Sequence, residues 1–68
     1  MEYNLKVKNR LQKYLDTTGA TISSVAKAID ISVPSISYFL KDKRLLVPEV
    51  LHKIEDHIDD VKSKMVNL

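Results

Sequence analysis

The fold is decided by residues 21–44, which read TISSVAKAIDISVPSISYFLKDKR. Apolar residues recur at three- and four-residue spacing in the first part of this stretch, which predicts a short helix. Thr21 is suited to cap the start of this helix, and Ile29 marks its expected end. The segment Asp30-Ile31-Ser32 then breaks the apolar period. The break indicates a tight turn.

A second short helix is expected directly after this turn. Ser32 can cap it, and Pro34 falls in its first turn, where the missing backbone N–H costs nothing. Ile36 and Phe39 share one helical face and are therefore predicted to lie in the core. Two short helices joined by a tight turn, over about residues 21–41, have the spacing of a helix-turn-helix.

Longer helices are predicted on both sides of this pair. The first covers about residues 4–16, where apolar residues recur at helical spacing: Val7, Leu11, Tyr14 and Leu15. Its other faces carry the basic residues Lys6, Lys8, Arg10 and Lys13. The last helix opens at Pro48 and continues to about Val66. No segment alternates like a strand, so residues 1–68 are expected to form one all-α domain, a compact four-helix helix-turn-helix domain with an extended C-terminal helix.

Composition and spacing argue against several classes of site. The 68-residue chain has no cysteine, which excludes disulfides and cysteine-ligated metals. His52 and His57 are five residues apart, which differs from the i, i+4 spacing of a helical metal pair. No catalytic motif is present, so we expect neither an enzyme nor a bound cofactor or metal. Because no secretory segment or membrane-spanning apolar run occurs, we expect a cytoplasmic protein without membrane contact.

Charge is divided unevenly along the chain. Residues 1–48 hold eight basic and four acidic side chains, a net charge of +4. Residues 49–68 hold three basic and five acidic side chains, a net charge of −2. This division suggests a basic surface that meets a polyanion and an acidic segment that faces elsewhere.

Residues 21–44 resemble the lambda-repressor-like family of helix-turn-helix proteins, which includes Cro-like phage regulators. That family usually has glycine in the turn at the position of Asp30, where the backbone is often left-handed, a conformation that Asp tolerates better than most residues. The resemblance implies a DNA-binding regulator of a phage or mobile element, whose helix after the turn enters the major groove. The stretch is also similar to the amino-terminal domain of a phage DNA-transposition helper protein, which implies DNA contact as well.

The resemblance assigns two sets of residues to DNA. The base or groove contacts fall on Ser32, Val33, Pro34, Ser37, Tyr38 and Lys41. The phosphate contacts fall on Thr21, Ser23, Lys27, Lys43 and Arg44. Since the first set lacks Arg, Asn and Gln, the side chains best suited to bidentate base recognition, we expect modest sequence discrimination.

The C-terminal helix carries a narrow apolar seam: Leu51, Ile54, Ile58, Val61, Met65 and Leu68. The first half of this seam can complete the core. The second half extends beyond what a compact core needs, so Val61, Met65 and Leu68 are candidates for a homodimer interface. Packing of this half against the first helix is the alternative.

Two hypotheses about function follow from these patterns. In the first, a dimer binds double-stranded DNA and represses transcription by occupying an operator. In the second, the chain is a protein-interaction module, such as an antirepressor or assembly adaptor, that uses the acidic C-terminal helix to bind a protein. The salt dependence of binding to random duplex DNA discriminates between the two.

Overall fold

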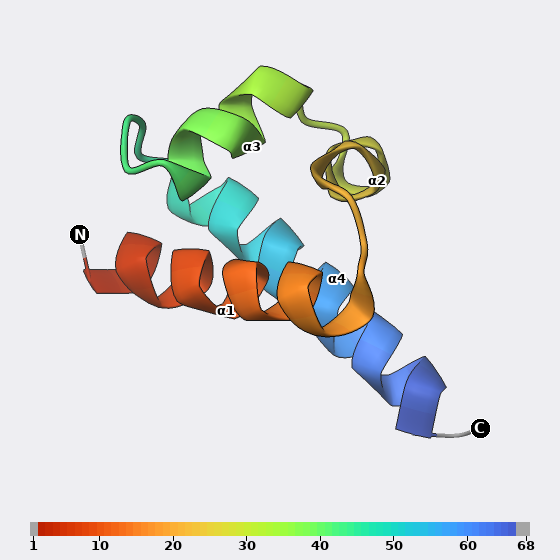
Figure 1. Ribbon diagram of the computed structural model, residues 1–68. Helices are drawn as coiled ribbons and strands as arrows, with labels where there is room; N and C mark the ends of the chain where they lie inside the picture. Colours follow the sequence, from red (N-terminus) through yellow and green to blue (C-terminus); the bar gives the residue numbers. More distant parts are fainter. Residues whose placement is uncertain (1, 67–68) are drawn as a thin grey trace.

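The fold is a bundle of four helices in the part of the chain that the computed structural model describes (Figure 1). The backbone is described for residues 2–66 and the side chains for residues 2–62. The helices are α1 (Glu2–Thr18), α2 (Ile22–Ile29), α3 (Val33–Leu40) and α4 (Pro48–Val66). Between residues 2 and 66 there is no strand. The all-α prediction is confirmed, with α1 two residues longer at each end than predicted.

The two long helices, α1 and α4, run side by side in the same general direction (Figure 1). Tyr3 contacts His52 near the start of both helices, and Arg10 contacts Asp59 further along both, with a separation of 49 residues in each case. When two helices run in parallel, contacting residues keep the same separation in sequence number along both helices. The short helix α2 packs on both α3 and α4, and α3 lies at the edge of the molecule.

One core joins all four helices. Its buried members are Val7, Leu11 and Tyr14 of α1, Val25, Ala26 and Ile29 of α2, Ile36 and Phe39 of α3, Leu46 of the loop, and Leu51, Ile54 and Ile58 of α4. Phe39 is the largest fully buried side chain, and truncating a buried Phe to Ala typically costs about 3–5 kcal/mol. That loss is a large fraction of the stability of a small domain. The predicted core positions of Ile36 and Phe39 are confirmed.

Each of the three helices before α4 is followed, within two residues of its end, by a residue with left-handed backbone: Gly19 (φ 73°), Asp30 (φ 59°) and Asp42 (φ 62°). After α3 the N–H of Lys43 donates to the carbonyl of Tyr38 at 2.9 Å, and the N–H of Asp42 donates to that of Phe39. These are the hydrogen bonds of a Schellman motif. The turn at Asp30 follows the prediction, and the turn at Asp42 falls in the segment Lys41–Arg44, which the sequence predicts as a basic loop without indicating its left-handed residue.

The two predicted N-caps differ. Thr21 caps α2, because its Oγ1 accepts a hydrogen bond from the N–H of Ser24 at 3.1 Å. Ser32 occupies the N-cap position of α3 but makes no side-chain cap bond. Its hydroxyl instead hydrogen-bonds to the hydroxyl of Ser35 at 2.8 Å. The expectation that Ser32 caps α3 through its side chain is therefore wrong, because this hydroxyl is directed at the side chain of Ser35 instead of a backbone N–H of the first turn.

Candidate DNA-binding surface

Helix α3 has one buried face and one exposed face. Ile36 and Phe39 are 0% and 2% exposed and anchor the helix on the core. Val33 and Tyr38 are 43% and 49% exposed on the outer face. Large apolar groups on the outside of a well-anchored helix are not required by the fold. They are therefore free to contact another molecule.

The six residues assigned to base or groove contacts all belong to α3 or its two ends: Ser32, Val33, Pro34, Ser37, Tyr38 and Lys41. Five of them are exposed, and Ser37 is partly buried. Residues 33, 34, 37, 38 and 41 are spaced by three and four, so they follow one side of the helix. The structure thus places five of the six predicted residues along one side of α3, with Ser32 at its N-cap.

The start of α2 carries two of the predicted phosphate contacts, Thr21 and Ser23. The oxygen of Thr21 is occupied by its cap bond, but its O–H proton stays free to donate. Ser23 is exposed at the first turn of the helix, where backbone N–H groups favour an anion. Lys27, from the last turn of α2, is exposed as well.

The loop after α3 folds back towards the start of that helix. Nη1 of Arg44 lies 3.3 Å from the hydroxyl of Ser35, which in turn contacts Ser32. The guanidinium is therefore held near the first turn of α3 while the side chain stays exposed. Sequence reasoning did not include Ser35 in the site. The sequence feature that could have identified Ser35 is its i, i+3 spacing from Ser32, which places the two hydroxyl groups next to each other on the first turn.

Ion pairs separate the basic residues into two groups. Lys8 binds Asp42 at 2.7 Å, and Arg10 binds Glu55 at 2.8 Å and Asp59 at 2.7 Å. The sequence placed these two basic residues on the faces of the first helix that carry no apolar side chains, and the structure adds their acidic partners. Within residues 2–62, no ion pair engages Lys27, Lys41, Lys43 or Arg44. The unpaired positive charge of the helix-turn-helix segment thus lies on α2, on the end of α3 and on the loop that follows.

The acidic face of α4 binds α1. The Tyr3 hydroxyl makes two hydrogen bonds to α4. Its single proton is donated to Oε1 of Glu55, so its oxygen accepts the other hydrogen bond, 2.9 Å long, from Nδ1 of His52. The hydrogen bond to Glu55, with desolvation, raises the pKa of Tyr3 to about 12. Hydrogen bonds from Tyr3 and Arg10 lower the pKa of Glu55. Together with the ion pair between Arg10 and Asp59, these contacts show that α1 binds two acidic side chains of α4, Glu55 and Asp59.

The apolar seam of α4 divides into a buried and a partly buried part. Leu51, Ile54 and Ile58 are buried, and Val61 is partly buried against the core of its own chain. The side chain of Met65 and the whole of Leu68 lie outside the described residues. The predicted subunit contact through Val61, Met65 and Leu68 stays a prediction.

The histidines have structural partners. His52 lies against Tyr3, and the ring of His57 meets that of Tyr14 edge-on with centroids 5.9 Å apart. Across the described residues, no three acidic or histidine side chains gather as a metal site would require. No helix within residues 2–66 combines the length and apolar character that a bilayer span needs.

Comparison with known proteins yields no match. No family model matches the chain, and neither curated proteins nor solved structures give a significant match. The surface around α3 therefore has to be interpreted from its own chemistry.

Proposed function

We propose that this protein binds double-stranded DNA by placing α3 in the major groove. The observation that carries the proposal is the outer face of α3, where Val33 and Tyr38 are exposed beside unpaired cations. The major groove is about 12 Å wide and admits one α-helix. Among the side chains of residues 2–62, Val33 and Tyr38 give α3 such a face, whereas α1 and α4 bind each other through Arg10 and Glu55.

Backbone contacts come from the residues around α3. Thr21 and Ser23 offer hydroxyl and backbone donors to one phosphate. Lys27, Lys43 and Arg44 are exposed cations that offer contacts to others. Phosphate contacts of this kind fix the position of a protein on the duplex without reading its sequence.

Base contacts come from α3 itself. Val33 and Pro34 present apolar groups suited to the thymine methyl. Ser32, Ser37 and Tyr38 act through hydroxyl groups, in part by way of water. Lys41 donates to guanine or to a groove wall. With no Arg, Asn or Gln on this face, discrimination between sequences is modest.

In the regulatory form of the proposal, a dimer occupies an operator and blocks transcription. Two copies related by a two-fold axis read two half-sites about one helical turn apart.

The second candidate function, a protein-interaction module, is favoured by one observation. Leu5, Leu45 and Val47 are more than half exposed although none of them belongs to α3.

The salt dependence of binding to a random duplex tests the proposal. Changing Lys27 and Lys43 together to Ala should weaken binding to all sequences alike and reduce the slope of log K against log salt by about 2. The matched control changes Lys13 and Lys62 to Ala, since both are exposed cations of α1 and α4. Equal slopes for the two double variants would contradict the phosphate contacts. If the unaltered chain does not bind duplex DNA at low salt, the result would favour the protein-interaction module.

A further inference from the structure

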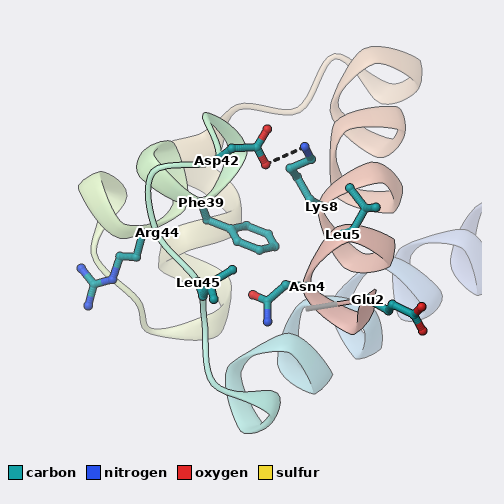
Figure 2. Close-up of a pocket in the computed structure, with 8 residues that line it drawn as sticks. All are labelled: Glu2, Asn4, Leu5, Lys8, Phe39, Asp42, Arg44 and Leu45. Atoms are coloured by element: carbon teal, nitrogen blue, oxygen red, sulfur yellow. Dashed lines mark hydrogen bonds and ion pairs between the residues drawn. The ribbon is translucent and has the colours of Figure 1, made fainter.

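Three large apolar side chains outside α3 are left uncovered by the rest of residues 2–62. Leu5, Leu45 and Val47 are 53%, 60% and 59% exposed. Leu5 and Leu45 line a cavity of about 290 Å³ whose inner wall includes the ring of Phe39 (Figure 2). Monomeric proteins rarely leave several large aliphatic side chains together in water. The cavity is open to an apolar side chain from outside.

The loop that carries this patch is held in place. Leu46 is buried, and its N–H donates to Oδ1 of Asn4 at 2.8 Å. Leu45 and Val47 flank this anchor, and both of their side chains are exposed. A second tie is the ion pair between Lys8 and Asp42. Because the surface is already ordered, a partner would lose little free energy in fixing it.

The charges around the cavity include acidic and basic side chains in equal number, so this surface is complementary in charge to a second copy of itself. Glu2 and Arg44 lie on opposite sides of it (Figure 2), and neither forms an ion pair within residues 2–62. The remaining two charges, Lys8 and Asp42, neutralise each other. A two-fold axis through the patch would bring Glu2 of each copy against Arg44 of the other, and in such a dimer Lys27 and Lys43 are left to contact phosphates.

We propose that Leu5, Leu45 and Val47 form an isologous dimer interface, in which Leu45 of each copy enters the cavity of the other. The mixed rim, with two acidic residues among four charges, is a poor match for a polyanion such as DNA. The interface itself does not depend on DNA binding. Its link to operator binding rests on the proposed function: the loop leads directly out of α3, whereas the far end of α4 is remote from α3 (Figure 1).

Sedimentation without DNA tests the interface. Leu45→Lys should raise the dimer dissociation constant by at least ~100-fold, because an unpaired ammonium would enter an apolar contact. Leu45 is well exposed, so the far-UV circular dichroism of the variant should be unchanged. Val33→Lys is the matched control, since Val33 is a large apolar residue that is also exposed but lies on α3. It should remain a dimer.

A charge exchange tests the orientation of the two copies. Glu2→Arg and Arg44→Glu should each weaken the dimer through repulsion between like charges, and the double variant should restore it. An unaltered chain that sediments as a monomer up to its solubility limit overturns the proposal. So does a Leu45→Lys variant that stays dimeric. If a variant with Val61 and Met65 changed to Lys is instead the folded monomer, the interface lies on the α4 seam. None of these results depends on whether the protein binds DNA.

Discussion

The N–H of Ile31 donates to the carbonyl of Ala26 at 2.9 Å across the end of α2. Asp30 lies between them in the left-handed region, and its own N–H donates to the carbonyl of Lys27 at 3.4 Å. This pair of bonds forms a Schellman motif with aspartate where glycine is usual. The motif ends α2 and places Ile31 against the core, which fixes where α3 begins.

The left-handed backbone at Asp30 predicts opposite responses to two substitutions. Asp30→Gly should be neutral or stabilising by up to about 1 kcal/mol, because glycine adopts this conformation without a steric cost. Asp30→Val should destabilise by about 1–2 kcal/mol, because its branched Cβ crowds the backbone there. Thermal melts of both variants check the prediction, and equal melting temperatures would contradict it.

Local patterns were sufficient to predict most of the fold. The apolar spacing around Ile36 and Phe39 predicted which side of α3 is buried, and therefore which side is exposed to a ligand. Thr21 was predicted as a cap because it directly precedes the apolar face that begins at Ile22, and its partner, the N–H of Ser24, is only three residues away. Such features depend on the backbone within one or two helical turns, which the sequence displays directly.

Contacts between distant residues could not be predicted in this way. The partners Lys8 and Asp42, and Asn4 and Leu46, are 34 and 42 residues apart and meet only because α1 and the loop after α3 pack together. The position of Arg44 over the start of α3 was also not predicted, because it depends on how the loop folds back onto that helix. Charge counting identified a basic segment, but it could not tell which cations the fold would neutralise.

The double ion pair of Arg10 predicts a stability contribution that salt reduces. Arg10→Gln should lower the free energy of unfolding by about 1 kcal/mol at low salt, since its contacts with Glu55 and Asp59 are partly exposed. In about 1 M NaCl the loss should shrink, because the Debye length falls to about 3 Å. Urea titrations measure both values. Lys13→Gln on the same helix serves as the control, and an equal loss there would show a general charge effect.

The hydrogen bond from Tyr3 to Glu55 predicts a decrease in stability at alkaline pH. The pKa of Tyr3 is raised from 10.0 to about 12 in the folded protein. Its contribution is therefore fully present below pH 10 and is lost as the pH rises towards 12, because the unfolded chain ionises first. Tyr3→Phe should reduce the alkaline drop in the urea midpoint, whereas Tyr38→Phe, which changes an exposed tyrosine, should leave it unchanged. A drop of the same size in both variants would contradict the prediction.

The same contact predicts a loss of stability in acid. The pKa of Glu55 is lowered from 4.5 by hydrogen bonds from Tyr3 and Arg10. Its contribution is therefore present above pH 4.5 and disappears as the pH falls through the lower folded value. Glu55→Gln should therefore reduce this loss of stability in acid. Asp56→Asn, an exposed neighbour on the same helix, should leave it in place, and acid melts of the two variants compare them.

The outer face of α3 predicts that Tyr38 affects sequence preference without affecting stability. Tyr38 is 49% exposed, so Tyr38→Ala should change the free energy of unfolding by less than about 1 kcal/mol. Ile36→Ala, on the buried face of the same helix, should cost about 2–5 kcal/mol.

Selection of bound fragments from a random duplex pool then measures what each chain prefers. Because base contacts specify and phosphate contacts only position, Tyr38→Ala and Ser37→Ala should each recover fragments with a different consensus at one or two positions. Lys43→Ala should recover the same consensus as the unaltered chain, with weaker binding throughout. If the Tyr38 and Ser37 variants both return the unaltered consensus, α3 does not read the bases, and its exposed side chains contact something other than the major groove.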